Sequence, residues 1–278
     1  MRYRSPVLKV LTWNILHGGG ANRMPRIALA IIERQPDVVA LTEFRSTIGG
    51  QIQGVLADHG LEYQLTTTLS RRRNGILLAS RYPLRPTTTV APGDLWSNRW
   101  LEAMIPDFAL RLAVVHVPDD TQLNRKAEYW HHLLAYGRLH AKTRCLVLGD
   151  FNTGRRLQDA VSGCFACEDL LGAFCTMGYR DAFRLKHPKA REYSWVSPFG
   201  SGFRIDGAYV SPLLRSHVAA AEYSHEERIG GADEPRASDH SLFLLSLSVR
   251  PSSAAAKTLP RGLFLGAEPE NRIESRGF

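Results

Sequence analysis

Apolar segments of this chain repeatedly end next to side chains that can bind a metal ion or a phosphate group. A single polar residue at a strand end usually marks only the edge of a core. Here many carboxylate, amide and imidazole groups share this placement, and strand ends are where ligands collect in α/β proteins. The residues are Asn14, Glu43, His116, Asp150, Asn152, Asp206, Asp239 and His240.

The chemistry that this set favours is metal-dependent cleavage of phosphodiesters. A hard divalent cation takes oxygen ligands such as Glu43 and Asp239 and keeps several waters. It can polarise a phosphate and stabilise the leaving oxygen. The sequence has no histidine and cysteine cluster with the spacing of a catalytic zinc site. We therefore expect Mg²⁺ as the cofactor, with Mn²⁺ as a substitute.

The remaining polar residues have expected roles around the phosphate. Asp150 would orient or deprotonate the attacking water, and Asn152 would fix the water or the phosphate. His240 would stabilise charge at the phosphate if Asp206 holds it, because a carboxylate partner fixes the tautomer and favours the imidazolium.

An α/β framework must position these residues. Apolar residues at helical spacing predict helices at 23–34, 48–59, 122–140 and 168–177. Short apolar runs between polar, Pro or Gly turns predict strands at 7–14, 37–44, 61–68, 74–80, 84–90, 100–105, 110–117, 144–149, 192–197, 203–210, 215–223 and 241–249. This density of short strands indicates sheets. The run RCLVLG lacks polar alternation, which predicts a strand covered on both faces.

The pattern predicts one domain followed by a tail. No flexible linker interrupts the elements of 1–250, whereas PSSAAAKTLPRG opens an expected flexible tail over 251–278. The sequence has no run of about 18 apolar residues that would span a membrane, and no apolar region with a signal-peptide cleavage site. We therefore expect a cytoplasmic protein without stable membrane association.

The charge of the chain favours a polyanionic partner. It has 35 Lys and Arg against 27 Asp and Glu, a net charge of +8 at pH 7. Such an excess favours nucleic acid, although mild basicity also serves solubility. The candidate substrate-binding residues are Arg71, Arg72, Arg73, Arg155, Arg156 and Trp195. Solvated charge runs and a core aromatic are the alternatives for these residues.

The spacing of the four cysteines does not predict a zinc site. Cys145 lies inside an apolar run and is expected to be a core thiol. Cys164 and Cys167 form a CxxC pair, and Cys175 follows as a third cysteine. A zinc site needs a fourth ligand, and the sequence has none at the spacing of such a site. Buried or incidental thiols are the expected interpretation.

Ordered motifs over about residues 7–249 resemble the endonuclease/exonuclease/phosphatase superfamily. They are TWN, LTEF, NGILLASRYPL, LGDFN, SW followed by RIDGAYVS, and SDHSLF. The resemblance implies a four-layered α/β sandwich, with two mixed β-sheets packed face to face and helices on the outside. It implies a metal-proximal pair in Asn14 and Glu43 and a second metal-side carboxylate in Asp239. It also implies a water-activating Asp150, a phosphate-orienting Asn152 and an Asp206–His240 pair.

His116 departs from one part of this superfamily. Exonuclease III-like and abasic-site endonucleases usually carry a tyrosine at this strand end. The HVPDD of this chain is closer to deoxyribonuclease I and to the phosphatase and sphingomyelinase branches. The histidine resembles a general acid for the leaving oxygen or a phosphate donor. The alternative is a histidine that only caps a strand. The departure weakens the expectation of abasic-site specificity.

The expected function is metal-dependent hydrolysis of phosphodiester bonds in nucleic acid, as an endonuclease or exonuclease with DNA favoured. A second hypothesis uses the same site on a lipid or small-molecule phosphoester. The chain offers no amphipathic insertion helix, lipidation signal or export signal in support of a lipid substrate. A third hypothesis, a catalytically inactive interaction module, is disfavoured by the intact set of polar residues.

Overall fold

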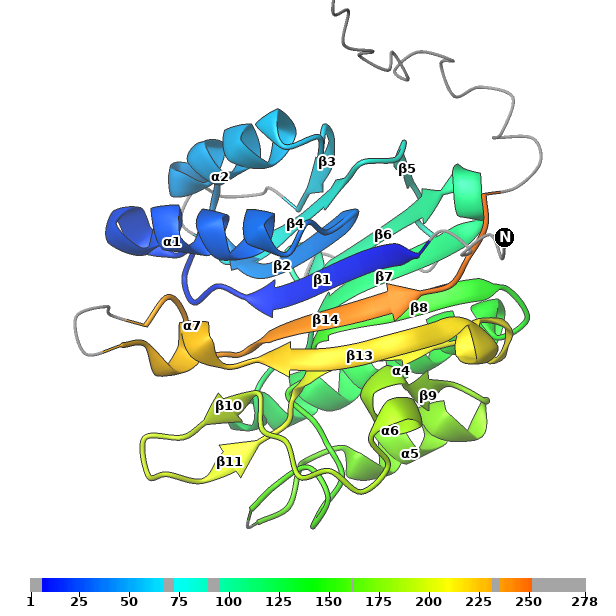
Figure 1. Ribbon diagram of the computed structural model, residues 1–278. Helices are drawn as coiled ribbons and strands as arrows, with labels where there is room; N and C mark the ends of the chain where they lie inside the picture. Colours follow the sequence, from blue (N-terminus) through cyan, green and yellow to red (C-terminus); the bar gives the residue numbers. More distant parts are fainter. Residues whose placement is uncertain (1–6, 68–72, 90–95, 162, 232–235, 252–278) are drawn as a thin grey trace, which may run out of the picture.

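The computed structural model describes residues 7–67, 73–89, 96–161, 163–231 and 236–251. Within these ranges the chain forms two six-stranded sheets that lie face to face, with helices on their outer sides (Figure 1). The tail expected over 251–278 lies outside the described residues except for residue 251.

The first sheet has the strand order β13-β14-β1-β2-β4-β3. Its strands are β1 (Leu8–Asn14), β2 (Val38–Phe44), β3 (Tyr63–Thr66), β4 (Gly75–Ser80), β13 (Val218–Ser224) and β14 (Leu242–Leu247). β1 and β2 are parallel, and the other neighbours are antiparallel, so the sheet is mixed.

The second sheet has the order β5-β6-β7-β8-β12-β9. Its strands are β5 (Arg85–Pro86), β6 (Trp100–Ile105), β7 (Leu110–His116), β8 (Arg144–Asp150), β9 (Arg180–Asp181) and β12 (Asp206–Val210). It is also mixed, because β7 and β8 are parallel while β8 and β12 are antiparallel. A separate hairpin pairs β10 (Trp195–Val196) with β11 (Gly202–Phe203).

Helices cover the outer face of each sheet. α1 (Gly20–Glu33) and α2 (Ser46–Asp58) pack on the first sheet, and α4 (Leu123–His140) and α5 (Glu168–Thr176) pack on the second. Shorter helices are α6 (Ala182–Lys186), α7 (Glu226–Ile229) and the 3-10 helices Pro106–Phe108, Asp120–Gln122 and Pro212–His217.

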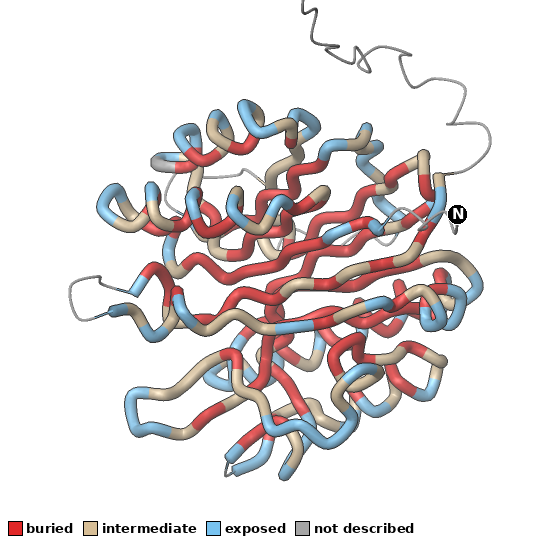
Figure 2. Tube along the Cα trace, viewed as in Figure 1, coloured by how far each residue is buried: buried red, intermediate tan, exposed pale blue. Residues whose placement is uncertain are grey.

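The alternation of side chains along the strands divides the core into layers. In β1, Leu8 and Val10 face the second sheet, whereas Leu11 and Trp13 belong to the cluster under α1 and α2. β8 is buried on both faces, as its unbroken apolar run predicted. The buried strands form the centre of the molecule in Figure 2. The predicted four-layered sandwich is therefore confirmed.

The ends of several predicted strands differ in the structure. The segment 203–210 divides between two sheets, since Phe203 pairs with Trp195 and β12 begins only at Asp206. Between them Arg204 is buried and donates to the carboxylates of Asp159 and Asp181. This non-local ion cluster interrupts a run that local propensity predicts as continuous. Within the described residues 84–89, the strand is limited to Arg85–Pro86.

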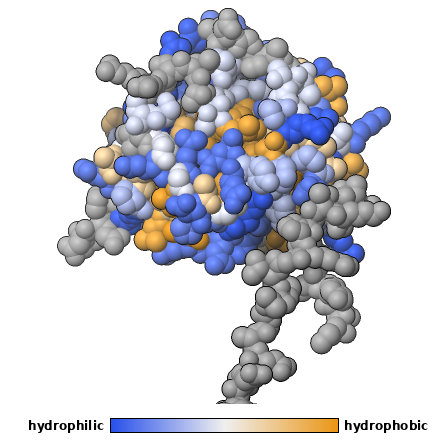
Figure 3. Space-filling model, turned by 90° about the horizontal axis from the view of Figure 1, so that it is seen from above, coloured by the Kyte–Doolittle hydropathy of each residue, from blue (hydrophilic) through white to orange (hydrophobic). Residues whose placement is uncertain are grey.

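The surface is of mixed polarity. Figure 3 shows hydrophilic residues over most of the coloured part of one face, with hydrophobic residues in smaller groups between them. Among the described helices, none combines the length and the apolar character that crossing a membrane requires.

Candidate active site

Three adjacent strands of the second sheet bring polar residues to one end of the inter-sheet core. In the strand register, His116 of β7 lies opposite Asp150 of β8, and Asp150 lies opposite Asp206 of β12. Leu148 and Val114, two residues earlier on β8 and β7, belong to the inter-sheet cluster. Because side chains alternate along a strand, the polar residues continue the inner face at the point where the core ends.

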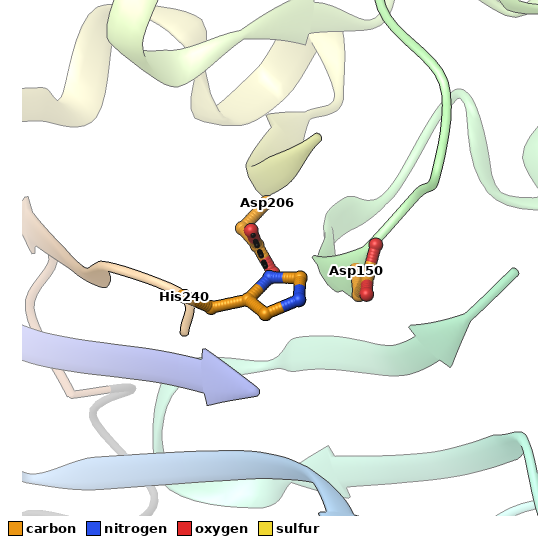
Figure 4. Close-up of side chains that lie close together, drawn as sticks. All are labelled: Asp150, Asp206 and His240. Atoms are coloured by element: carbon orange, nitrogen blue, oxygen red, sulfur yellow. Dashed lines mark hydrogen bonds and ion pairs between the residues drawn. The ribbon is translucent and has the colours of Figure 1, made fainter. Parts of the chain in front are cut away.

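Asp206 and His240 form a buried pair (Figure 4). His240 Nδ1 donates to Asp206 Oδ2 over 2.8 Å. Burial opposes the charged imidazolium, but the Asp206 carboxylate outweighs it and raises the pKa of His240 to about 10. His240 is therefore a buried cation at neutral pH.

Asp150 is a carboxylate held by two amides. Asn14 Nδ2 donates to Asp150 Oδ2 at 3.1 Å, and the Asn152 backbone N–H donates to Oδ1 at 2.9 Å. Burial, with the nearby charge of Asp206, raises the pKa of Asp150 to about 7, against the opposing effects of His240 and the two amides. The Asn152 side chain donates to Val117 O at 2.8 Å, which links the loop after β8 to the loop after β7.

Gly149 allows β8 to reach this position. Its φ is 134°, and a Cβ at this residue would lie 2.0 Å from Val115 O. Only a residue without a side chain fits between β8 and β7 here. The glycine before Asp150 is thus required by the close approach of the neighbouring strand.

Glu43 enters the site through a β-bulge. Simple alternation would place it with Val39 and Leu41 under the outer helices. The register of β2 instead shifts between Thr42 and Phe44, and Glu43 has φ 58°. Its Oε1 lies 3.4 Å from Asn14 Nδ2, while Phe44 takes the place in the outer core.

The orientation of Asn14 defines its part in the site. Its Oδ1 accepts from Leu16 N at 3.0 Å, and its Nδ2 faces the carboxylates of Glu43 and Asp150. An amide nitrogen does not bind a cation. In these contacts Asn14 supports both carboxylates and lies beside Glu43, the other member of the pair that the resemblance implied.

His116 lies between two carboxylates. Its Nε2 is 3.8 Å from Asp150 Oδ2 and 4.0 Å from Glu43 Oε1. Burial lowers the pKa of His116 well below its usual value, and the charges of Arg99, His240 and His17 lower it further. The imidazole is therefore neutral at pH 7 and can donate a hydrogen bond, but it is a poor source of a proton.

Trp195 and Asp239 close the site on the side of β10. Trp195 Nε1 donates to Asp239 Oδ2 at 3.1 Å, and the Trp195 backbone forms an isolated bridge with His240. The Trp195 ring lies 5.8 Å from that of Phe203. Asp239 Oδ1 is buried without a hydrogen-bond partner in the described part of the chain.

Two groups of residues could hold a cation. Ligand atoms of Asp150, Asp206 and His240 lie within 4.8 Å of one another. However, His240 already donates from Nδ1 to Asp206, and an imidazolium has no free lone pair for a metal. Glu43 and Asp239 instead offer carboxylate oxygens. Asp239 Oδ1 has no hydrogen-bond partner among the described residues and lies 4.0 Å from His240 Nε2. The donor set of Glu43 and Asp239 fits a hard divalent cation better.

Of the predicted substrate-binding arginines, the structure describes Arg73, Arg155 and Arg156. Arg155 directs a guanidinium nitrogen to Cys175 Sγ at 3.4 Å, so its observed contact is with α5. Arg156 and Arg73 are exposed. Arg71 and Arg72 lie outside the described residues. Sequence proximity to Asp150 therefore does not by itself direct the Arg155 side chain to the site.

The structure adds two cations that sequence reasoning missed. Lys126 of α4 is fully buried, and its ammonium donates to the carboxylate of Asp120 and to the backbone carbonyl of Asn152. Arg99 donates to His116 O at 3.3 Å. A lysine inside a helical pattern is usually solvent-facing, and Arg99 precedes a strand without any motif, so neither residue gave a local signal.

The cysteines lie largely as expected. Cys145 is fully buried, and burial raises the pKa of its thiol to about 11. Trp13 and Trp130 are buried in the two outer core clusters. Cys164 is exposed and Cys175 is buried, and both are free thiols.

Comparison of the fold with solved structures gives several strong matches. An abasic (AP) endonuclease from Archaeoglobus fulgidus has a TM-score of 0.71 at 18% identity, over 86% of this chain and 99% of that chain. The 3′ phosphatase NExo from Neisseria, bound to a product DNA hairpin, has a TM-score of 0.71 at 19% identity with the same coverage. A structure described as the 3′-5′ exonuclease NExo from Neisseria meningitidis has a TM-score of 0.70 at 20% identity, again over 86% and 99%.

Comparison by sequence gives the family. No curated protein matches the chain. The model of the Endonuclease/Exonuclease/phosphatase family, however, matches residues 11–240, a span that contains every polar residue of the site. On this match and on its four-layered fold, the chain belongs to the endonuclease/exonuclease/phosphatase family.

Proposed function

We propose that this protein hydrolyses phosphodiester bonds of nucleic acid, with DNA favoured, through a domain spanning residues 1–250. The observation that carries the proposal is the convergence of a carboxylate with a pKa near neutrality, Asp150, and a buried imidazolium, His240, at one end of the core. A base and a cation side by side suit attack of water on a phosphate.

A divalent cation is part of the proposal. Asp239, whose Oδ1 is buried without a hydrogen bond among the described residues, and Glu43 are the residues that would hold it. When bound, such an ion would polarise the phosphate and stabilise the leaving oxygen. Mg²⁺, with Mn²⁺ as its substitute, matches these oxygen donors.

The proposed work of the protein side chains follows from their contacts. Asp150 takes the proton of the attacking water, because its raised pKa of about 7 matches a base operating near neutral pH. Asn14 and Asn152 hold that carboxylate in place. His240 carries positive charge to the phosphate, and neutral His116 donates a hydrogen bond to a phosphate or leaving oxygen.

Cations near the site support a polyanionic substrate. Arg99 lies beside His116. Arg23 lies near both Asp239 and Glu43. Burial lowers the pKa of Arg23, and the charges of these two carboxylates oppose that effect. The net charge of +8 acts in the same direction. Nucleic acid, with regularly spaced phosphates, is the substrate class that uses such a distribution.

A substrate panel tests the proposal. The purified chain is stripped of metal with a chelator, supplied with Mg²⁺ or Mn²⁺, and given plasmid, single-stranded DNA, abasic duplex, 3′-phosphorylated duplex, RNA and phospholipid. We expect cleavage of nucleic acid that needs the added metal and that Glu43→Gln abolishes. Glu62→Gln makes the same chemical change at an exposed residue and is expected to keep full activity.

The panel also tests the alternative function. Turnover of phospholipid or a sugar phosphate, with every nucleic acid left intact, would replace the first proposal by a small-phosphoester hydrolase. Loss of activity in Glu62→Gln as well as in Glu43→Gln would contradict the assignment of Glu43 as a residue that holds the cation.

The substrate-binding arginines are tested by salt dependence. Each phosphate contact contributes a slope of about −0.9 to the plot of log affinity against log salt. Replacement of Arg155 and Arg156 by Ala is therefore expected to flatten the slope for duplex DNA by about 2. An unchanged slope would show that neither arginine contacts a phosphate of the substrate.

A further inference from the structure

His17 places an imidazole nitrogen against Glu43 in the loop after β1. Its Nδ1 lies 2.9 Å from Glu43 Oε2, and its backbone N–H donates to the same oxygen at 2.7 Å. The side chain is 59% exposed, so it is not a core residue. Both Leu16 and His17 have left-handed backbone conformations, with φ 49° and 53°. Non-glycine residues in this region cost energy and often occur at functional sites.

The hydrogen bonds around Asn74 define the state of the His17 ring. Arg45 Nε donates to Asn74 Oδ1 at 2.6 Å, and arginine has only donors, so the amide oxygen must face Arg45. The amide nitrogen then faces His17 Nδ1, at 3.2 Å. Since that nitrogen is a donor, Nδ1 carries a lone pair and the ring proton lies on Nε2.

This tautomer leaves two electron-pair donors facing each other. His17 Nδ1 and Glu43 Oε2 both carry lone pairs and are 2.9 Å apart. Two adjacent ligands of an octahedral cation, each bound at about 2.1 Å, are separated by about 3.0 Å. The observed spacing is therefore that of two neighbouring ligands of one ion.

We propose that His17 Nδ1 is a ligand of the divalent cation that Glu43 binds, and that this nitrogen raises the affinity of the site for Mn²⁺ more than for Mg²⁺. The inference rests on the proposed function, in which Glu43 holds the cation. Imidazole nitrogen binds first-row transition ions better than it binds Mg²⁺, whose preferred ligands are oxygens. The Asn74 amide nitrogen keeps the His17 ring in the tautomer that a metal ligand needs. When the ion binds, it replaces this amide nitrogen as the partner of His17 Nδ1.

Pulsed electron paramagnetic resonance on the metal-free full chain loaded with Mn²⁺ tests the proposal. A histidine ligand gives a ¹⁴N coupling to the Mn²⁺ spin, which a water or carboxylate ligand does not. We expect this coupling in the wild type and its loss in His17→Gln. His217→Gln is the matched control, because His217 contacts Ser248 O far from the site, and it is expected to keep the coupling.

Titration calorimetry with Mn²⁺ and Mg²⁺ supplies the second readout. His17→Gln is expected to lose about 10-fold in Mn²⁺ affinity, with a smaller loss for Mg²⁺, while circular dichroism stays unchanged. Bound Mn²⁺ without ¹⁴N coupling in the wild type, or coupling that persists in His17→Gln, would overturn the inference and leave the proposed function standing. Absence of any Mn²⁺ or Mg²⁺ binding, in the wild type as in Glu43→Gln, would overturn both.

Discussion

Replacement of Asp206 by Asn isolates the charge that keeps His240 protonated. Asn has nearly the shape of Asp, and its Oδ1 can still accept the hydrogen bond that His240 Nδ1 donates over 2.8 Å. The geometry of the pair is therefore expected to survive, while its electrostatics change.

The structure sets the size of this effect. The pKa of His240 is raised from its ordinary value of 6.5 to about 10. At about 1.36 kcal/mol per unit, the folded protein favours the imidazolium by about 5 kcal/mol. In Asp206→Asn burial still opposes the imidazolium and the charges of Asp150 and Asp239 still favour it, so the pKa of His240 is expected to fall back toward its ordinary value.

Nuclear magnetic resonance titration of the histidine ring signals in metal-free protein measures this pKa. Nuclease turnover at pH 7 is expected to fall about 100- to 1000-fold, as when one preorganised electrostatic group is lost. Asp58→Asn, the same change at an exposed position of α2, is the control and is expected to keep both values. A His240 pKa in Asp206→Asn within about one unit of the wild type would refute the reasoning.

Two further predictions concern stability. Gly149→Ala is expected to lower the free energy of unfolding by about 3 kcal/mol or more, because its Cβ would lie 2.0 Å from Val115 O. Gly172 of α5 has open space around it, so Gly172→Ala is expected to raise the free energy of unfolding by about 1 kcal/mol. Equal free energies of unfolding for the two variants in urea denaturation would contradict this account. Asp150 has a raised pKa, so its contribution to stability is complete below about pH 4 and is lost as the pH rises through about 7. Urea denaturation of metal-free Asp150→Asn should therefore show a stability gain over the wild type that grows by up to about 4 kcal/mol between pH 4 and pH 8; a pH-independent difference would contradict it.

Most strands and the longer helices were predictable because their signals are local, whereas the four-layered arrangement was implied by the family resemblance. Alternation and helical spacing depend on the backbone geometry of single segments, so the positions of most strands and of the longer helices followed from the sequence. The placement of polar residues at strand ends followed as well. Which of these strand ends are neighbours came from the structure, where His116, Asp150 and Asp206 lie side by side on β7, β8 and β12.

Side-chain direction within the site was not predictable, because non-local contacts decide it. Glu43 reaches the site through a register shift that depends on the pairing of β2 with β4. Lys126 turns inward because the carbonyl of Asn152 meets it there. Arg155 directs its guanidinium to the buried Cys175 of α5.

The sequence by itself therefore determined which residues could do chemistry and which end of the sheets would carry them. Only the tertiary structure decided which of them meet. A strand dictates the direction of its own side chains, but the pKa of a carboxylate such as Asp150 depends on burial and on neighbours such as Asp206. Those neighbours arrive from other strands, and no local pattern encodes their distance.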